Sequence, residues 1–463
     1  MTQVVWLRSD LRVQDNPALF HALQTGEDVI ACTGIAQQTW QRHRRGDNQA
    51  TLINNRCHHL AAELAALRVP LRRLAAPTFE AQIDEVLGLC GQFQAKALHF
   101  NVQYEWDEAQ RDQALAQRAP LRVHSYHDQC AIRPGTLKTG QGSFYSVFTP
   151  FKRRWLALQS EQMIQPLGTP PASKAMACTP SEWALNAQAE QQWPSDTASV
   201  HQRLNAWVSL AHRYDQTRDL PSVDGTSQLS PYLAIGALSA QQILHALAME
   251  HPGLYQDSGG IGTFVSEICW RDFYRNLIVE VPRVSRDQPF KLETRGMRWN
   301  TSEQDFDRWA TGQTGIPIVD AAMRQLLATG WMHNRCRMIV AMFLTKNLFI
   351  HWRRGEDFFM RHLVDADLAS NNGGWQWSAS TGTDAAPYFR VMNPVTQSER
   401  FDPEGTYIRR WVPELNALDA KRIHAPFAKG PVHGLDYPAP MVDLKVSRQQ
   451  AIDNFKAHLQ EQK

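Results

Sequence analysis

Residues Asp365 to Arg390 read DADLASNNGGWQWSASTGTDAAPYFR, and the rest of the chain is interpreted around this stretch. Between Leu368 and Pro387 it holds two tryptophans but no leucine, isoleucine or valine, so no ordinary amphipathic core face can be drawn there. Two carboxylates without a histidine, followed by asparagines and glycines, suit a flat polar aromatic ligand better than a metal ion. The alternative is a polar surface loop, although exposed loops seldom carry two indoles so close together.

Length and composition describe a globular protein of more than one domain. A chain of 463 residues exceeds one ordinary core, and 43% hydrophobic with 20% charged residues is typical of soluble proteins. No apolar run approaches the ~20 residues of a membrane span, and the N-terminal sequence lacks a signal peptide. Seven scattered cysteines without a C-x-x-C spacing indicate reduced thiols in the cytoplasm, with neither a disulfide frame nor a zinc site. The formal net charge of +2 is only a weak sign of a polyanionic partner.

The first ~140 residues alternate short apolar runs with helical segments, which predicts a parallel α/β sheet. No G-x-G-x-x-G or GK[ST] loop follows the first strand, so a dinucleotide held in the usual Rossmann manner is not expected. The expected strands are 4–7, 29–35, 71–74, 97–100 and 122–126, and the expected helices are 48–67, 79–93 and 105–117.

The remainder of the chain predicts helices without strands. From residue 168 to about 199 it is rich in Pro, Ala, Ser and Gln without a period, which is typical of a linker. We therefore expect an α/β domain at 1–132, an interdomain linker at 133–200 and a larger all-helical domain at 201–463. The expected helices are 240–249, 263–280, 306–310, 318–328, 335–348 and 355–363.

Two motifs carry candidate chemistry. GTSQLSP at Gly225 to Pro231 offers hydroxyls and free N–H groups before a possible helix, which favour an anion such as a pyrophosphate; plain N-capping is the alternative. FVSEICWRDFYRNL at Phe264 to Leu277 puts Glu267, Trp270, Arg271 and Tyr274 on one helix face. With two arginines, Arg271 and Arg275, such a face suits an extruded base, although an exposed ion-paired helix would look similar.

The opening stretch resembles the flavin-binding signature of the photolyase/cryptochrome family, specifically its class I cyclobutane pyrimidine dimer photolyases. The resemblance runs from VVWLRSDLRVQDNPAL at Val4 to LDYPAP at Leu435. It implies FAD as cofactor, active in its reduced form. Gln228 departs from the basic residue that is more usual in the diphosphate loop. The flavin contacts that the resemblance implies are Tyr214, Thr226, Ser227, Gln228, Leu229, Ser230, Phe264, Asp365, Asp367 and Asn371.

The same resemblance implies a pocket for a flipped pyrimidine dimer in UV-damaged DNA. Trp270 would pack against the dimer, and Glu267 would hydrogen-bond a thymine carbonyl. This hydrogen bond would become stronger as the dimer gains negative charge. Asn334 stands where the (6-4) branch of the family expects a histidine, and His333 would face about 100° around the helix. The remaining substrate and DNA contacts implied are Asn334, Met338, Trp377, Arg218 and Arg335, the last two at phosphates.

Three tryptophans, Trp299, Trp352 and Trp375, resemble the family's chain of electron carriers from the surface to the flavin. Asn371 aligns with the asparagine that the photolyases place beside flavin N5, where many cryptochromes carry aspartate or cysteine. Asn101, Tyr104 and Glu105 resemble contacts to an antenna, 5,10-methenyltetrahydrofolate. Ser285 and Arg286 depart from the Cys-Lys pair expected there.

We therefore expect a light-driven lyase in which excited reduced FAD donates an electron to the dimer and then recovers it. The alternatives are a blue-light receptor without repair activity and a plain electron-transfer flavoprotein. A monomer without a membrane segment, a metal ion or an obligate protein partner is expected.

Overall fold

The computed structural model describes residues 2–162 and 165–461, which divide into two compact units. Unit 1 comprises residues 1–212, 227–282 and 364–369, and unit 2 comprises residues 213–226, 283–363 and 370–463. The predicted boundaries at residues 132 and 200 stay a prediction.

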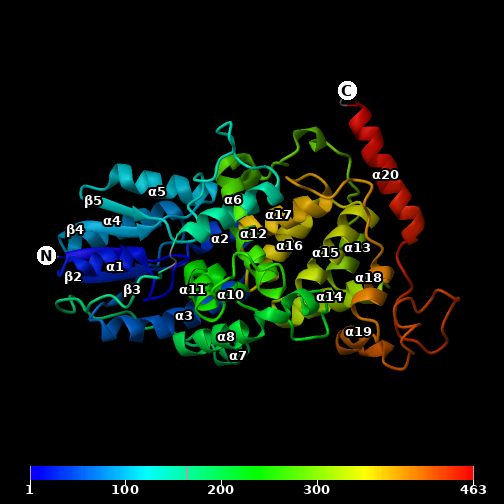
Figure 1. Ribbon diagram of the computed structural model, residues 1–463, viewed down its shortest axis with the longest axis horizontal. Helices are drawn as coiled ribbons and strands as arrows, with labels where there is room; N and C mark the ends of the chain where they lie inside the picture. The colour runs from blue at the N-terminus through cyan, green and yellow to red at the C-terminus, as the bar shows by residue number, and fades with distance from the viewer. Residues whose placement is uncertain (1, 163–164, 462–463) are drawn as a thin grey trace. The chain divides into compact units, whose positions relative to one another are not determined.

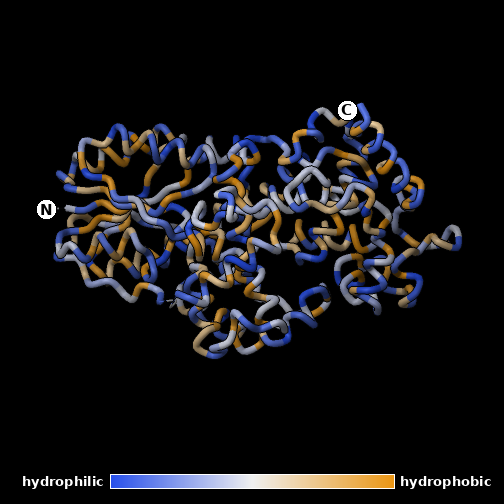
Figure 2. Tube along the Cα trace, turned by 45° about the horizontal axis from the view of Figure 1, so that its top comes forward, coloured by the Kyte–Doolittle hydropathy of each residue, from blue (hydrophilic) through white to orange (hydrophobic). Residues whose placement is uncertain are grey.

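Unit 1 is built on a five-stranded parallel sheet in the order β3-β2-β1-β4-β5, as the alternating apolar runs predict. Its order reverses between β1 and β4, where Val4 pairs with Ile30 on one side and Leu98 on the other. Hydrophobic residues gather along these strands (Figure 2). The strands are β1 Thr2–Trp6, β2 Asp28–Thr33, β3 Leu71–Arg73, β4 Ala95–Asn101 and β5 Arg122–Tyr126.

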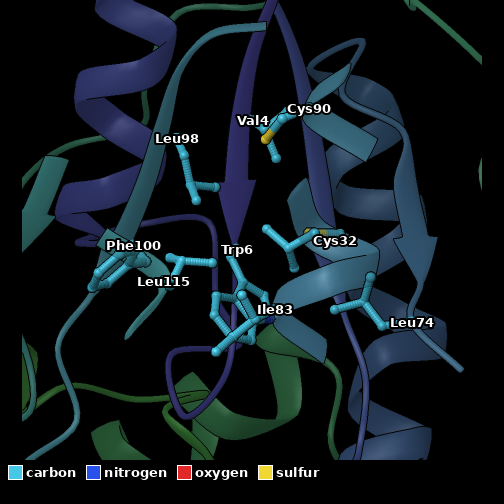
Figure 3. Close-up of a cluster of buried hydrophobic side chains, with 10 residues drawn as sticks. Val4, Trp6, Cys32, Leu74, Ile83, Cys90, Leu98, Phe100 and Leu115 are labelled. Carbon is cyan, nitrogen blue, oxygen red and sulfur yellow. The ribbon is translucent and has the colours of Figure 1, made fainter. Parts of the chain in front are cut away.

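One face of this sheet is closed by helices α4 (Phe79–Gln92) and α5 (Trp106–Arg118). Trp6, which is fully buried, lies in the resulting cluster with Ile83 of α4 and Leu115 of α5 (Figure 3). The other helices of unit 1 are α1 Pro17–Gln24, α2 Gln37–Arg42, α3 Asp47–Ala66, α6 Phe148–Glu161, α7 Ala187–Gln192, α8 Thr197–Leu210, α10 Ser230–Ile235, α11 Ala240–Glu250 and α12 Gly260–Glu280 (Figure 1).

Two of these helices, α6 and α7, lie within the range expected to be a linker. α6 buries Phe148, Phe151 and Trp155, so its sequence FTPFKRRW encodes a packed helix rather than a spacer. Residues 168–186, the Pro- and Ala-rich part, contain no helix or strand.

Unit 2 is helical, as predicted, apart from an isolated bridge between Asn300 and Ile350. The predicted helix 335–348 is observed as α15 followed by a π-helical turn, Phe343–Asn347. The helices are α9 Tyr214–Thr217, α13 Glu303–Ala310, α14 Pro317–Thr329, α15 Asn334–Met342, α16 Trp352–His362, α17 Leu368–Ala379, α18 Pro394–Phe401, α19 Thr406–Trp411 and α20 Leu444–Glu461 (Figure 1).

None of the described helices is both long and apolar enough to cross a membrane. All seven cysteines are free, and six of them are buried.

Candidate functional site

Within the stretch Asp365 to Arg390, residues 368–379 form a helix, α17, whereas residues 381–390 contain no helix or strand. Asn372, Trp375 and Gln376 form a buried face, with Asn372 and Trp375 2% exposed. Asn372 Nδ2 donates to Glu356 Oε1 of α16 (2.8 Å), and Gln376 Nε2 donates to Asn372 Oδ1 (2.9 Å). Side-chain amides thus supply the packing that aliphatic residues supply elsewhere, which excludes the surface-loop alternative for residues 368–379.

The other face of α17 is half-buried and leaves space. Asn371 and Gly374 lie there, three residues apart and therefore on the same side of the helix. A Cβ added at Gly374 would meet no atom within 4 Å. Asn371 Nδ2 donates to the backbone carbonyl of Glu356 (3.0 Å), which fixes the amide and presents its Oδ1 as an acceptor. This face can receive a flat ligand that carries an N–H group.

Glu356 links α16 to both asparagines of α17. Its side chain is 1% exposed, and burial raises the pKa of its carboxyl to about 7, against the opposing effects of Arg353 and the Asn372 hydrogen bond. The identity of this residue was not anticipated from the sequence, because a lone glutamate in a charged helix carries no local signal.

In unit 1, the segment 227–230 does not behave as a simple N-cap. No side chain caps α10, since Ser230 Oγ instead donates to Asp365 Oδ2 (2.6 Å). Ser227 Oγ accepts from Leu229 N (3.3 Å), and Gln228 has a left-handed backbone with φ 49°. Plain N-capping is therefore wrong, and these hydroxyls serve other partners.

Arg203 of α8 supplies a cation beside this segment. Its Nη1 donates to Gln228 Oε1 (3.2 Å), at the residue whose lack of charge departs from the family pattern. Sequence reasoning missed Arg203, because it lies on an earlier helix.

Asp367 has a different partner from Asp365. Asp367 Oδ2 accepts from Nη2 of Arg275, which is 2% exposed. Two further predicted flavin residues of unit 1, Leu229 and Phe264, are buried, and Phe264 meets Trp207 edge-on with ring centroids 5.0 Å apart. In unit 2, Thr226 is half-buried and Tyr214 is buried, with the Arg218 guanidinium 5.3 Å from the Tyr214 ring centre.

Helix α12 presents a partly exposed face within an otherwise buried helix. Glu267, Trp270 and Tyr274, here called the α12 face, are half-buried, whereas Ile268, Cys269 and Phe273 are buried. Trp270 stacks on Phe148 with ring centroids 3.5 Å apart and planes 7° from parallel, and on Tyr274 at 5.4 Å. Phe148 therefore fixes the indole, a partner that the sequence did not reveal.

Arg271 is half-buried like the residues of this face, as predicted, whereas Arg275 is buried and does not share it. Arg271 donates to the carbonyls of Gln129 and Leu233, and Arg275 pairs with Asp367. Both guanidinium groups are thus used inside unit 1 because they satisfy buried acceptors there.

In unit 2, α15 carries the other predicted substrate residues. Asn334 is exposed and Met338 half-buried, one turn apart on the same side. Arg335 is largely covered: its Nη2 donates to Asp219 Oδ1 (2.7 Å), and its guanidinium lies 4.5 Å from the Phe401 ring centre. Asp219 also lies 3.8 Å from Arg218 Nε, so one carboxylate faces both predicted phosphate contacts.

The three predicted electron carriers, here called the tryptophan chain, all lie in unit 2. Trp352 and Trp375 are each 2% exposed, and Trp299 is half-buried. His351 lies between Trp299 and Trp352, with its ring centroid 5.3 Å from that of Trp299 and 5.6 Å from that of Trp352. Burial and then Arg353 lower the pKa of His351 to about 4, so this bridging ring is neutral at neutral pH.

Gly355 joins Trp375 to the same helix that carries Trp352. The Trp375 ring lies so close to Gly355 that an added Cβ would come within 2.1 Å of Trp375 Cη2. Since Gly355 is three residues beyond Trp352, Trp375 lies against the side of α16 that also carries Trp352. Trp377, also on α17, is half-buried.

The predicted antenna residues differ in availability. Asn101 is 3% exposed, and its amide is fully engaged: Nδ2 donates to Asp10 Oδ2 and Asn16 Oδ1, while Oδ1 accepts from Ala18 N. Tyr104 Oη bonds His127 Nδ1 at 2.8 Å.

Glu105 is 5% exposed, and its Oε2 has no hydrogen-bond partner among the described residues. Burial and then Glu108 raise the pKa of its carboxyl. Of the three, only Glu105 offers an unused buried acceptor.

No group of three histidine, cysteine or carboxylate side chains in residues 2–162 and 165–461 is arranged to hold a metal ion.

Comparison with known proteins gives the family. The family described as "DNA photolyase" matches residues 3–172, and the one described as "FAD binding domain of DNA photolyase" matches residues 264–457. A Vibrio cholerae relative named deoxyribodipyrimidine photo-lyase is 43% identical over 98% of this chain and 99% of its own length.

Two solved structures share the fold. A class III photolyase from Agrobacterium tumefaciens superposes with a TM-score of 0.86 at 32% identity, covering 99% of this chain and 97% of that one. A cryptochrome from Synechocystis superposes with a TM-score of 0.86 at 26% identity, covering 98% of each chain. Similarity of fold alone therefore does not separate photolyases from cryptochromes.

Proposed function

The chain belongs to the DNA photolyase family, within its class I cyclobutane pyrimidine dimer branch, and from this premise we propose how its own residues perform the reaction. It is a light-driven DNA repair enzyme that splits cyclobutane pyrimidine dimers and uses FAD. Bound FAD, in its reduced form, supplies on excitation the electron that opens the dimer. The observation that carries our proposal is the α12 face, which keeps a carboxyl group and a stacked indole accessible on a buried helix.

The flavin ring of FAD would be held by residues of α17. The open half-buried face of α17 fits a flat ring, and Asn371 Oδ1 fits an N–H group such as the one at N5 of a reduced flavin. The hydroxyls of Ser227 and Ser230 fit diphosphate oxygens. Arg203, beside Gln228, would contribute the positive charge that the loop itself lacks.

The α12 face would receive the flipped dimer. Trp270, held flat by Phe148, replaces part of the stacking that a base loses on extrusion. The carboxyl group of Glu267 would hydrogen-bond to a thymine carbonyl, and this bond strengthens as the carbonyl gains negative charge. In unit 2, Asn334, Met338 and Trp377 are the further residues that the family resemblance assigns to the dimer.

DNA phosphates would be contacted by Arg218 and Arg335. Both now face Asp219, so binding of a phosphate requires exchange of one anionic partner for another. This exchange lowers the net binding free energy that each phosphate contact contributes.

The tryptophan chain would deliver electrons that return oxidised FAD to its reduced form. Trp352→Phe should block light-driven reduction by an external thiol, because phenylalanine is harder to oxidise than indole. Repair by enzyme that is already reduced should be unaffected. A variant that photoreduces at the normal rate would exclude this route.

Glu105 would hold the folate antenna, since its orphaned Oε2 can accept from the amide or amino edge of a pterin. We also propose that the enzyme works as a monomer in the cytoplasm. The free cysteines fit a reducing compartment, and every step above uses residues of one chain.

The experiment that tests the substrate assignment measures affinity for dimer DNA in the dark and repair yield per absorbed photon. Trp270→Ala should cost roughly 1–3 kcal/mol, about fivefold to a hundredfold in dissociation constant. Glu267→Ala should lower the yield at saturating DNA, because its bond matters most after electron transfer.

Glu267→Gln is the matched control, because its amide can still donate, and it should keep part of the yield. If both quantities stay unchanged in Trp270→Ala and Glu267→Ala, the dimer binds elsewhere and a cryptochrome-like receptor becomes the better account.

A further inference from the structure

A pocket of about 670 Å³ opens in unit 2 beside Trp299, the outermost member of the tryptophan chain. Its walls come from the segment around Trp299, from the end of the π-helical turn at Asn347, and from one side of α20. Phe349, stacked on Trp299 with ring centroids 4.9 Å apart, belongs to the same wall. The size is within the range of small-molecule sites.

One wall residue, Asn347, joins the π-helical turn to α20. Asn347 is 7% exposed, and its Nδ2 donates to Ser447 Oγ of α20 at 3.0 Å. Its Oδ1 is buried and has no hydrogen-bond partner among the described residues. The hydrogen bond between Asn347 and Ser447 therefore fixes two walls of the pocket relative to each other.

The charged residues of the wall are mostly acidic. Asp305, Asp443 and Asp453 face the pocket together with a single cation, Arg298. Three carboxylates and one guanidinium give a formal charge of −2. The pocket therefore repels anions and attracts neutral or cationic molecules.

We propose that this pocket binds the small reductant that restores Trp299, and that it selects a neutral or cationic thiol over an anionic one. This inference rests on the proposed function of the tryptophan chain. One electron passes from the thiol to the oxidised indole of Trp299, which returns to its resting state. The thiol releases its sulfur-bound proton to water and leaves as a thiyl radical, and two such radicals combine to a disulfide in solution.

The test follows the decay of the tryptophan radical after a light flash, in full-length enzyme loaded with oxidised FAD. Three thiols of similar size but different charge serve as donors: cysteamine, 2-mercaptoethanol and 3-mercaptopropionate. At low ionic strength the decay rate with cysteamine should saturate with concentration, as expected for a bound donor. The decay rate with cysteamine should also exceed the rate with 3-mercaptopropionate by about tenfold. This is the order of magnitude expected when a cation or an anion approaches a site of net charge −2 at close range.

Two variants alter the pocket without entering the tryptophan chain. Asp443→Asn combined with Asp453→Asn removes two charges, and the asparagine at 443 can still accept the N–H groups at the start of α20. The cysteamine preference should fall to within about twofold. The control pair is Asp436→Asn with Glu461→Gln, two exposed acids outside the pocket with the same total charge change, which should keep the preference.

Val446→Trp should close the pocket, because Val446 lines it and is 53% exposed on α20, where a larger side chain is tolerated. Saturation should disappear in this variant. Rates that rise linearly with concentration for all three thiols, without charge preference, would overturn the pocket assignment alone. Absence of any tryptophan radical after the flash, or a radical unaffected by Trp299→Phe, would overturn the tryptophan chain and the pocket's role with it.

Discussion

Gly355→Ala tests whether Trp375 must lie against α16 for the enzyme to accept electrons. The added Cβ would come within 2.1 Å of Trp375 Cη2 and 2.3 Å of Cζ3, whereas ordinary contact begins at 3.4 Å. The ring or the helix must therefore shift by at least 3.4 − 2.1 = 1.3 Å. Trp375 is 2% exposed and meets Phe359 and Trp309 edge-on, so little room is available for that shift.

The size of the effect follows from two opposing contributions to stability. Overpacking of a buried site costs roughly 1–3 kcal/mol. Replacing a helical glycine by alanine returns roughly 0.5–1 kcal/mol through backbone entropy. The control is Gly88→Ala, at an exposed position of α4 where a Cβ would meet no atom within 4 Å. It should stabilise by about 0.5–1 kcal/mol, so the two variants should differ by roughly 1–3 kcal/mol.

The assays are denaturant unfolding and light-driven reduction by external thiol, each on both variants. Gly355→Ala should be the less stable protein and should photoreduce more slowly, while Gly88→Ala should photoreduce as the unmodified enzyme does. If Gly355→Ala gains stability as Gly88→Ala does and photoreduces normally, the contact between Trp375 and α16 has no part in electron delivery.

Three further predictions concern single residues. Glu105→Ala should remove the near-ultraviolet absorbance of bound folate and lower repair per incident photon without abolishing it; absence of a second chromophore even after folate reconstitution of the unmodified enzyme would contradict the assignment. Arg335→Ala should weaken binding to damaged and undamaged DNA alike and reduce the salt slope by about one unit, whereas Asp219→Asn, which removes the competing carboxylate, should strengthen both; a loss confined to damaged DNA would make Arg335 a dimer contact. Lys346 is fully buried, with its Nζ donating to Ser380 Oγ, and burial and then Lys291 lower its pKa from 10.5 to about 7. Between these two pH values the folded state therefore binds fewer protons than the unfolded state, so its stability rises with pH. Relative to Lys346→Met, the unmodified enzyme should gain on the order of 4 kcal/mol of unfolding free energy from pH 7 to 10.5. Equal pH profiles of the two proteins in denaturant unfolding would refute this prediction.

The sheet and most helices could be predicted because their apolar periodicity is local and strong. Helix α17 could not, since asparagine, glycine and serine are weak helix formers, and its stability comes from amide bonds to Glu356 and Val284. The π-helical turn was missed for a related reason: the sequence FLTKN carries no mark of the extra residue in the turn. Helix α6 was not distinguished from the expected linker, because its sequence FTPFKRRWLALQSE carries a proline and several charged residues between its buried aromatic ones.

In the candidate site too, residues in local sequence motifs could be predicted, and residues that act through distant contacts could not. Residues such as Asn371 and Trp352 stand in long motifs whose resemblance to a family could be recognised. Arg203, Phe148, His351 and Gly355 act through neighbours from other segments, and no local pattern distinguishes them from ordinary helix residues. The buried bonds of Arg271 likewise depend on carbonyls more than 30 residues away in the sequence.

The most direct test of the central claim is light-dependent loss of cyclobutane dimers from an irradiated oligonucleotide mixed with the purified, reduced enzyme. The account predicts that dimers disappear under near-ultraviolet or blue light, stay intact in the dark, and restore unmodified pyrimidines without consumption of external reductant. Glu267→Ala should show the same dark binding but a lower yield per absorbed photon. Dimers that persist under light, with a correctly reduced flavin visible in the absorption spectrum, would contradict the account.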